Sequence, residues 1–200
     1  KKGPVYIEKN VNIHGHTKLE GPLFIGKNST IFGGRISKSS IGKSCKVTGE
    51  IVNSIIESFS NKAHSGFLGD SYVGRWVNLG AGTTTSNLKN DYSSISVIKE
   101  NKKIETEKQF LGTIFGDHVK TAIGTQLNSG SIISLGSIIY NHKFLTKYYP
   151  PFSWGNGEKK QYHQLEKFFE SMERIMKRRE IELSDNYKQL YALLHKNYTK

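Results

Sequence analysis

Aliphatic residues recur at every sixth position along much of this chain. The series runs Ile7, Ile13, Leu19, Ile25 and Ile31, then Ile41 and Val47, then Val73 and Leu79, then Phe115, Leu127, Ile133 and Ile139, with Thr121 as one polar member. A period of six fits neither an amphipathic helix nor an alternating strand. Three such units make one triangular coil, and successive coils stack as parallel strands about 4.8 Å apart. The sequence therefore predicts an all-β solenoid built from hexapeptide repeats, with each repeat residue pointing into a shared core.

Two segments interrupt the repeat. The spacing fails between Val47 and Val73, so we expect the coil around residues 53–70 to carry a loop. Residues 86–114 form a longer interruption that contains the strand-like segments "SISVI" and "KIETE" on either side of a polar turn. This arrangement predicts an inserted hairpin that projects from the stack.

The end of the chain has a different pattern. Residues 147–157, "KYYPPFSWGNG", form a connector rich in Pro, Gly and aromatic residues that ends the coils. Beyond it, apolar residues at helical spacing predict two amphipathic helices: Tyr162, Leu165, Phe169, Met172 and Met176, then Leu183, Tyr187, Leu190 and Leu194. We expect a β-solenoid domain over residues 1–157 and a helical extension over 158–200, which either caps the open end of the stack or packs against a neighbouring subunit.

Composition limits the function classes. The only cysteine, Cys45, fits a reducing compartment, and we expect a cytoplasmic protein. No apolar run approaches the roughly 20 residues of a membrane span. The net charge of +12 attracts anions, yet the sequence contains no nucleic-acid-binding motif. Two interpretations of the charge remain: the protein binds small anionic ligands, or the basic surface is merely solvated. The chain starts inside the repeat and without Met, which suggests that it is part of a longer protein.

Residues 61–91, "NKAHSGFLGDSYVGRWVNLGAGTTTSNLKND", contain an unusual concentration of small residues. With the hexapeptide repeats, "NSII" and "LGTIFGDHVKTAIG", this segment resembles the C-terminal domain of the bifunctional glucosamine-1-phosphate acetyltransferase and N-acetylglucosamine-1-phosphate uridyltransferase family. The likeness covers residues 1 to about 157 and is greatest for the divergent sugar-nucleotidyltransferase-like branch. It implies a left-handed parallel β-helix that forms a homotrimer, with acetyl-CoA or another acyl-CoA between neighbouring subunits. It also implies an amino-sugar phosphate or a nucleotide sugar as the acceptor, and a nucleotidyltransferase domain upstream.

The resemblance also assigns roles to individual residues. His64 takes the position of the general base, and Asn87 is the second catalytic candidate. Asn87 and Asn78 take positions that line the acceptor site. The residues placed beside the coenzyme are Gly80, Ala81, Gly82, Thr125 and His118. The residue types suit the reaction, because an attacking amine must lose a proton to a base that titrates near the working pH. Small residues would let the pantetheine arm lie against the backbone.

Some positions depart from the family pattern. Arg35 matches an arginine that holds the sugar phosphate, but the accompanying lysine falls at Val52. Phe67 and Leu88 stand where the family has tyrosines. The acceptor therefore need not be glucosamine-1-phosphate, and the cations that could replace the lost charge are Lys62, Arg75 and Lys89.

Each assignment has a structural alternative. Gly80 and Gly82 could serve only the tight corners of a coil. Asn78 could belong to an internal side-chain ladder, His64 could be an ordinary loop histidine, and His118 a solvated corner residue. His14 and His16 have a spacing that could share one face, but without nearby carboxylates or cysteines we expect no metal site.

Three functions remain open on the sequence alone. The first is an acyl-CoA-dependent N-acetyltransferase. The second is a non-catalytic β-helix that trimerises or regulates a nucleotidyltransferase domain, and the third is a purely structural assembly domain. Binding of a coenzyme separates the first from the other two. We favour the enzyme, because a scaffold does not need histidine and asparagine in this arrangement.

Overall fold

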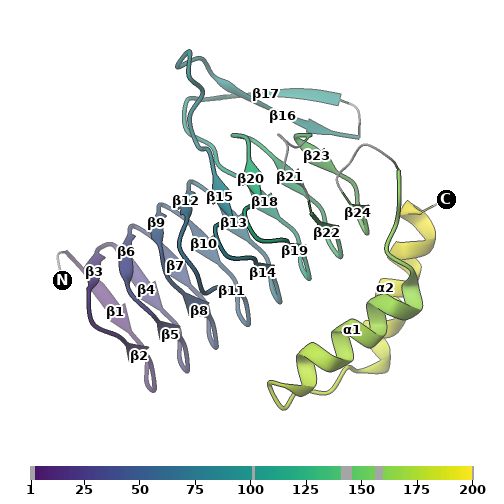
Figure 1. Cartoon of the computed structure of the whole chain (residues 1–200), viewed down its shortest axis with the longest axis horizontal. Helices are drawn as coiled ribbons and strands as arrows, with labels where there is room; N and C mark the ends of the chain where they lie inside the picture. The colour runs from purple at the N-terminus through teal and green to yellow at the C-terminus, as the bar shows by residue number, and fades with distance from the viewer. Residues whose placement is uncertain (1–2, 101, 141–145, 156–159, 200) are drawn as a thin grey trace.

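A computed structural model describes residues 3–100, 102–140, 146–155 and 160–199 of the chain. It is a left-handed parallel β-helix followed by two α-helices, so the predicted fold class is confirmed (Figure 1). The first face of the β-helix consists of β1 (Val5–Ile7), β4 (Leu23–Ile25), β7 (Ser40–Ile41), β10 (Ile55–Ile56), β13 (Tyr72–Val73), β18 (Ile114–Phe115), β21 (Ile132–Ile133) and β23 (Tyr148–Tyr149).

The other two faces follow the same parallel pairing. The second face consists of β2 (Asn12–Ile13), β5 (Thr30–Ile31), β8 (Lys46–Val47), β11 (Asn61–Lys62), β14 (Asn78–Leu79), β19 (Lys120–Thr121), β22 (Ile138–Ile139) and β24 (Trp154–Gly155). The third consists of β3 (Thr17–Glu20), β6 (Gly34–Ser37), β9 (Glu50–Val52) and β12 (Phe67–Gly69), continued by the pair β15 (Thr84–Thr85) and β20 (Gln126–Leu127).

The repeat residues form the core, as their spacing predicted. Those from Leu19 to Ile139 are buried in one apolar cluster along the axis of the β-helix. Thr121, the polar member of the series, is also buried, and its hydroxyl lies 2.8 Å from the hydroxyl of Thr83. Ile13, on the first coil, is 37% exposed. Stacking thus buries one inward residue per strand, and burial of this apolar surface provides most of the stabilisation.

The prediction of a loop around residues 53–70 is wrong. The strands β9, β10 and β11 pair in register with the coils on both sides, and β12 pairs in register with β9. Ile51, Ile56 and Leu68 continue the buried series. Two features hide the repeat in the sequence. The distance along the chain between inward residues falls below six at some corners, and the inward residue of β11 is a lysine, Lys62, which is 1% exposed.

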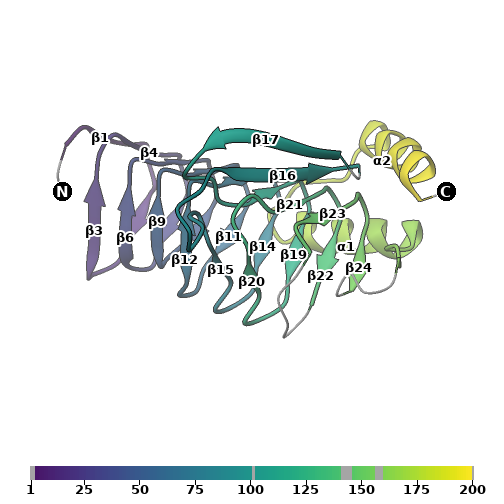
Figure 2. The ribbon, with the colours of Figure 1, turned by 90° about the horizontal axis from the view of Figure 1, so that it is seen from above.

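The interruption after β15 contains an antiparallel hairpin of β16 (Ile95–Lys99) and β17 (Lys102–Lys108). This hairpin lies along the later coils rather than extending away from them (Figures 1 and 2). Ile95 and Val97 are buried there. A glycine is required at position 130, because a Cβ atom would lie 2.6 Å from the Ile95 side chain.

The helices α1 (Leu165–Lys177) and α2 (Asp185–Tyr198) lie toward the C-terminal end of the stack (Figures 1 and 2). They pack along the corner between the first and second faces (Figure 1). Ser184 caps α2 by accepting a hydrogen bond from the Tyr187 N–H group. The expected boundary between residues 157 and 158 lies outside the described residues. Within the described part of the chain, neither helix is long and apolar enough to cross a membrane.

The corner under the helices explains where they dock. One residue of each corner has a left-handed backbone conformation, with φ near +60°: Asn10, Asn28 and Ser44 on the early coils, then Phe59, Trp76, His118 and Phe152. Asparagine tolerates this conformation, whereas a bulky residue adopts it only at a cost. Packing of the aromatic side chains on the later coils offsets that cost. Phe59 stacks on Trp76 with 4.3 Å between ring centroids, and the ring centroid of Phe152 lies 5.2 Å from that of Phe168 in α1.

This packing can be tested with Phe168→Ala. Phe168 is fully buried between His118, Phe152 and Tyr191. Its truncation should lower the free energy of unfolding by about 3–5 kcal/mol in urea denaturation. Leu193→Ala, on an α2 side chain that is 57% exposed, is the control and should cost less than about 0.5 kcal/mol. Equal losses in the two variants would contradict docking through the aromatic corner.

Candidate functional site

His64 lies on the corner between β11 and β12, and its side chain is exposed. The corner is held from inside the β-helix, because the Lys62 ammonium group donates hydrogen bonds to the backbone carbonyls of His64 and, at 2.9 Å, of Ser65. Burial lowers the pKa of Lys62 to about 8. The expectation that Lys62 binds substrate is therefore wrong: its charged group is inside the coil and orients the backbone that carries His64.

The His64 imidazole has no hydrogen-bond partner among the described residues. A catalytic histidine usually has its second ring nitrogen bonded to an orienting group. A ligand or a second copy of the chain must supply that group here if His64 acts as a base.

The corner of His64 is repeated on the next coils. Ala81 and Ile123 occupy the equivalent position, two residues beyond the inward residue of β14 and of β19. Ile123 is 68% exposed, and Cβ atoms built on Gly82 and Gly124 would find no neighbour closer than 3.7 Å. These residues form a flat, partly apolar surface that begins at His64 and follows the axis of the β-helix. We call it the corner strip.

Two of the predicted coenzyme contacts are internal. A Cβ on Gly80 would lie 2.5 Å from the Ala122 carbonyl group, so this glycine is required for stacking of the coils. Thr125 is fully buried, and its hydroxyl donates to the Ala122 carbonyl at 2.8 Å. The structure therefore contradicts a contact between the Thr125 hydroxyl and a thioester.

Asn87 belongs to a polar cluster at the far end of the third face. Its amide nitrogen donates to Oδ2 of Asp70 at 2.6 Å, while Oδ1 of Asp70 accepts from Asn53, also at 2.6 Å. A Cβ on Gly69 would clash with the Phe67 ring at 2.4 Å, so Gly69 makes room for this aromatic side chain. Asp70 fixes the orientation of Asn87 and leaves its amide oxygen and its second N–H for a ligand.

The two predicted catalytic residues do not meet within this chain. His64 precedes β12, and the partner of Asn87, Asp70, follows it, so the three-residue strand, about 10 Å long, separates them. Phe67 lies between the two on the same face. A sugar-sized ligand could span that distance, whereas a direct hydrogen bond could not.

Arg35 is on the same face but is already paired. It donates to Glu20 at 2.9 Å and to Glu50 at 3.1 Å, and Glu50 separates it from Phe67. Hydrogen bonds from Lys18 and Arg35 lower the pKa of Glu20. Val52, in the place of the family's lysine, pairs in register with Gly69. The third face thus offers no unpaired cation beside Phe67.

The remaining predicted residues lie elsewhere. Asn78 is on the outer surface of the second face, where its Oδ1 accepts from Asn61 at 3.4 Å, so the ladder that it joins is external. Lys89 donates to Ser93 at 3.1 Å and to the carbonyl of Ser94 within the loop before β16. Neither side chain lies on the His64 corner.

The expectation for His118 is wrong. His118 is fully buried between Trp76, Phe168 and Tyr191, and neither ring nitrogen has a hydrogen-bond partner. It is neither a coenzyme contact nor a solvated corner. Arg75 occupies the same corner, with its guanidinium group 5.9 Å from the Phe59 ring centroid. His118 lies beneath the helices, in contact with Phe168 of α1 and Tyr191 of α2.

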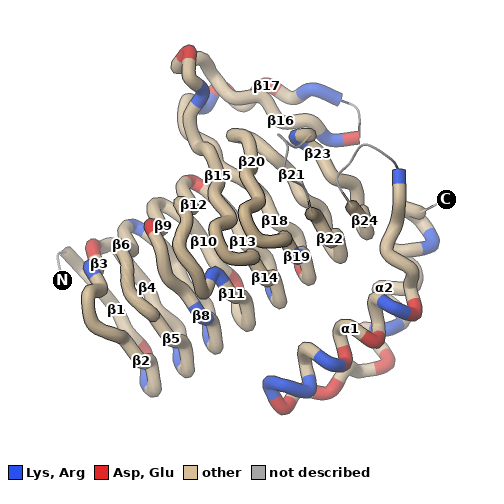
Figure 3. Tube along the Cα trace, viewed as in Figure 1, with Lys and Arg blue, Asp and Glu red and all other residues tan. Residues whose placement is uncertain are grey.

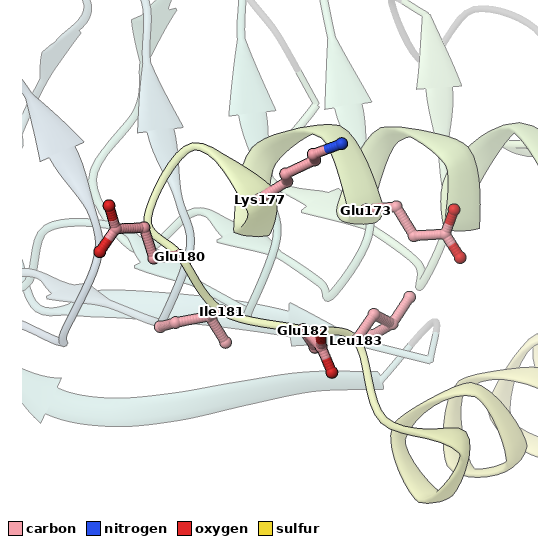
Figure 4. Close-up of a pocket in the computed structure, with 6 residues that line it drawn as sticks. All are labelled: Glu173, Lys177, Glu180, Ile181, Glu182 and Leu183. Carbon is pink, nitrogen blue, oxygen red and sulfur yellow. The ribbon is translucent and has the colours of Figure 1, made fainter.

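One hollow lies away from His64. It has a volume of about 660 Å³ and lies at the turn between the helices, lined by Glu173, Lys177, Glu180, Ile181, Glu182 and Leu183 (Figure 4). Its three carboxylates disfavour an anionic ligand. His14 and His16 are exposed near the N-terminus, and no group of metal-binding side chains occurs in the described ranges.

Sequence reasoning missed Asp70, Asn53 and Ile123. Asp70 ends the "FLGD" segment just after His64, which was a usable signal, because an acidic residue at a corner can anchor amides on both neighbouring coils. The exposed isoleucine gave a weaker signal, since it falls outside the six-residue series. No signal placed Asn53 beside Asp70.

The buried histidines predict a pH dependence of stability. Burial lowers the pKa of His118 to about 3 and that of His163 to about 4, whereas an unfolded histidine titrates near 6.5. Between these values the unfolded chain binds more protons, so the free energy of unfolding should fall as the pH falls below about 6.5. Each histidine contributes a loss of about 2 kcal/mol between pH 7.5 and 5.

Urea denaturation at both pH values checks this expectation. His118→Phe keeps an aromatic ring in the site and should lose about 2 kcal/mol less than the parent chain over the same interval. An unchanged pH dependence in His118→Phe would contradict a neutral, unpaired His118.

Comparison with known proteins agrees with the fold and with the earlier resemblance. The chain is 34% identical over 150 residues to a bifunctional sugar-1-phosphate nucleotidylyltransferase/acetyltransferase of Sulfurisphaera tokodaii, covering 70% of this chain and 36% of that protein. It is 31% identical over 139 residues to the bifunctional protein GlmU of Wigglesworthia glossinidia brevipalpis, covering 68% and 28%. The chain therefore spans about a third of the length of these curated relatives. No protein-family model matches it.

Among solved structures, the fold matches a mutant of AntD from Bacillus cereus. AntD is an N-acyltransferase, and that structure contains dTDP-4-amino-4,6-dideoxyglucose and coenzyme A. The TM-score is 0.51 at 16% identity, with 87% of this chain and 91% of that chain covered. At this identity the match supports the fold alone.

Proposed function

We propose that this chain, which is similar over about two thirds of its length to the acetyltransferase-containing bifunctional sugar-1-phosphate nucleotidylyltransferases, is an acyl-CoA-dependent N-acetyltransferase. The acceptor is an amino-sugar phosphate or a nucleotide sugar. The observation that carries the proposal is the corner strip, in which half-buried Ala81 and exposed Ile123, on successive coils, lead to His64. A scaffold gains nothing from leaving such a surface uncovered.

The strip suits an acyl-pantetheine arm. An extended arm can lie along Ala81 and Ile123 because the open space at Gly82 and Gly124 lets it approach the backbone. Its thioester then faces His64, whose imidazole takes the proton from the acceptor amine as the nitrogen attacks the thioester carbonyl. The C–N bond forms, the C–S bond breaks, and the thiolate leaves and is protonated. Lys62 supports this step by fixing the backbone of His64.

The acceptor sugar would lie on the third face. The Phe67 ring offers an apolar surface, and Asn87, oriented by Asp70, offers an amide oxygen and an N–H. AntD, which has the same fold, was solved with a nucleotide amino sugar and coenzyme A, so this fold is able to hold an acceptor of this class. The buried free thiol of Cys45 agrees with a reducing, cytoplasmic setting.

A homotrimer would complete the site. The outward residues of the first face form a row along the β-helix that includes Tyr6, Ile55, Tyr72 and Ile114, which are 37–64% exposed. Ser40 interrupts this row between Phe24 and Ile55. An exposed, largely apolar row of this kind usually marks an interface. A second copy would also supply the group that orients His64, which this chain alone does not provide.

Sedimentation velocity tests the assembly. The parent chain should sediment as a species of three 22.5 kDa chains, and Tyr72→Glu should shift it to monomers, because a charge is costly within an apolar interface. Tyr92→Glu, on an exposed tyrosine outside the row, is the control and should remain trimeric. A monomeric parent chain would contradict the assembly.

Release of free thiol from acetyl-CoA tests the activity, with glucosamine-1-phosphate and a panel of amino sugars and nucleotide amino sugars as acceptors. His64→Ala should reduce kcat by at least about 100-fold, as expected for loss of a general base. His16→Ala, an exposed histidine far along the stack, is the control and should leave kcat unchanged.

A non-catalytic trimerising or regulatory domain is the alternative function. It is favoured by the absence, among the described residues, of a group that orients His64. No turnover with any acceptor, together with no rise in melting temperature on addition of coenzyme A, would replace the enzyme by this alternative.

A further inference from the structure

A groove of about 330 Å³ lies between the second face of the β-helix and the end of α1. Four cations line it: Lys46 from β8, Lys120 from β19, and Arg178 and Arg179 just beyond α1. Basic segments are visible at the end of α1 and on the neighbouring coils (Figure 3). The side walls include the Asn61–Asn78 amide pair and the ring of Trp76.

None of these four cations forms an ion pair within the described part of the chain. Arg179 donates to Oδ1 of Asn61 at 3.2 Å, and the Lys120 ammonium group donates to the His118 carbonyl at 3.3 Å. These contacts orient the two charged groups without neutralising them. Burial lowers the pKa of Lys120 to about 8, which reflects a position partly withdrawn from water.

Four unneutralised cations held close together repel one another, so an anion that enters the groove relieves that repulsion. The residue types are specific as well, because arginine binds phosphate oxygens through a planar pair of donors and lysine adds a point charge. A charge of two or more on the ligand matches the site better than a single carboxylate.

The third face differs from the groove in the pairing of its cations. Arg35 is paired with Glu20 and Glu50. The third face therefore offers an anion less unneutralised positive charge than the groove does. In contrast, Asn78, predicted from the sequence to line the acceptor site, lies in the basic groove.

We propose that this groove binds the diphosphate group of a nucleotide. The proposal rests on the proposed function for the source of the diphosphate, which is either a nucleotide sugar or coenzyme A. The helical extension then has a role in ligand binding, because it supplies two of the four cations. The surface formed by these four cations is distinct from the His64 corner strip, which lies along another edge of the β-helix.

Isothermal titration calorimetry of the full chain tests the groove directly, with inorganic pyrophosphate, UDP and coenzyme A as probes. Arg178→Gln/Arg179→Gln should weaken binding of the diphosphate ligand by at least about tenfold, because two charge-assisted contacts are lost. The control Arg174→Gln/Lys177→Gln removes the same charge from the exposed surface of the same helix and should change affinity less than about twofold. Lys46→Gln, on a strand, is a second variant that does not depend on how the helix folds.

The probes identify the source of the diphosphate. If the groove variants lose affinity for UDP alone, the groove binds the nucleotide sugar. If they lose affinity for coenzyme A alone, the groove binds the cosubstrate. The inference is overturned if no probe binds the parent chain, or if the groove variants and the control variant bind equally well.

The binding test also separates this inference from the proposed function. A groove-dependent loss of binding in a chain that releases no thiol from acetyl-CoA would support the groove and contradict the transferase. Acetyl transfer that occurs with equal diphosphate affinity in groove and control variants would support the transferase and contradict the groove.

Discussion

The register of the stacked coils determines every other feature of the structure. Backbone hydrogen bonds between parallel strands fix each residue directly above its equivalent on the coil before, as in the pairing of Leu79 with Thr121 and of Thr121 with Ile139. A side chain at a given corner therefore has only its equivalents as axial neighbours. Rows along the axis, rather than contacts between distant segments, are the units from which surfaces of this protein are built.

Each of the important surfaces is such a row. Small and apolar residues at one corner make the corner strip above His64, and aromatic residues at another make the docking surface for α1 and α2. An outward row of amides and lysines on the second face becomes a basic groove once Arg178 and Arg179 are laid over it. The helical extension thus both stabilises the stack, by covering apolar surface, and contributes charge to one of its faces.

The six-residue repeat was enough to predict the parallel β-helix, because one inward aliphatic residue per strand is the condition for stacking. It failed between Val47 and Val73, where the inward residue Lys62 is charged yet buried. A lysine is tolerated there because two backbone carbonyls accept its hydrogen bonds, and a one-dimensional pattern does not reveal such partners. The same limit hid the hydrogen-bond network in which Asp70 joins Asn53 to Asn87.

The helices show a second limit. Their apolar faces were evident from the sequence, but the surface that receives them was not. The substitution of Phe59, Trp76, His118 and Phe152 for the polar corner residues of earlier coils marks that surface. This surface can be recognised only when it is known which residues occupy equivalent corners of successive coils, because neighbouring members of this set are 17 to 42 positions apart in the chain. For this reason His118, a plausible groove residue by motif, is instead part of a buried aromatic cluster.

A crystal structure of the chain with coenzyme A tests acyl transfer at His64 most directly. We expect the pantetheine arm to lie along Ala81 and Ile123, with the sulfur within about 4 Å of a His64 imidazole, as required for attack on a thioester beside the base. Coenzyme A bound away from the corner strip, or no bound coenzyme A at millimolar concentration, would contradict acyl transfer at His64.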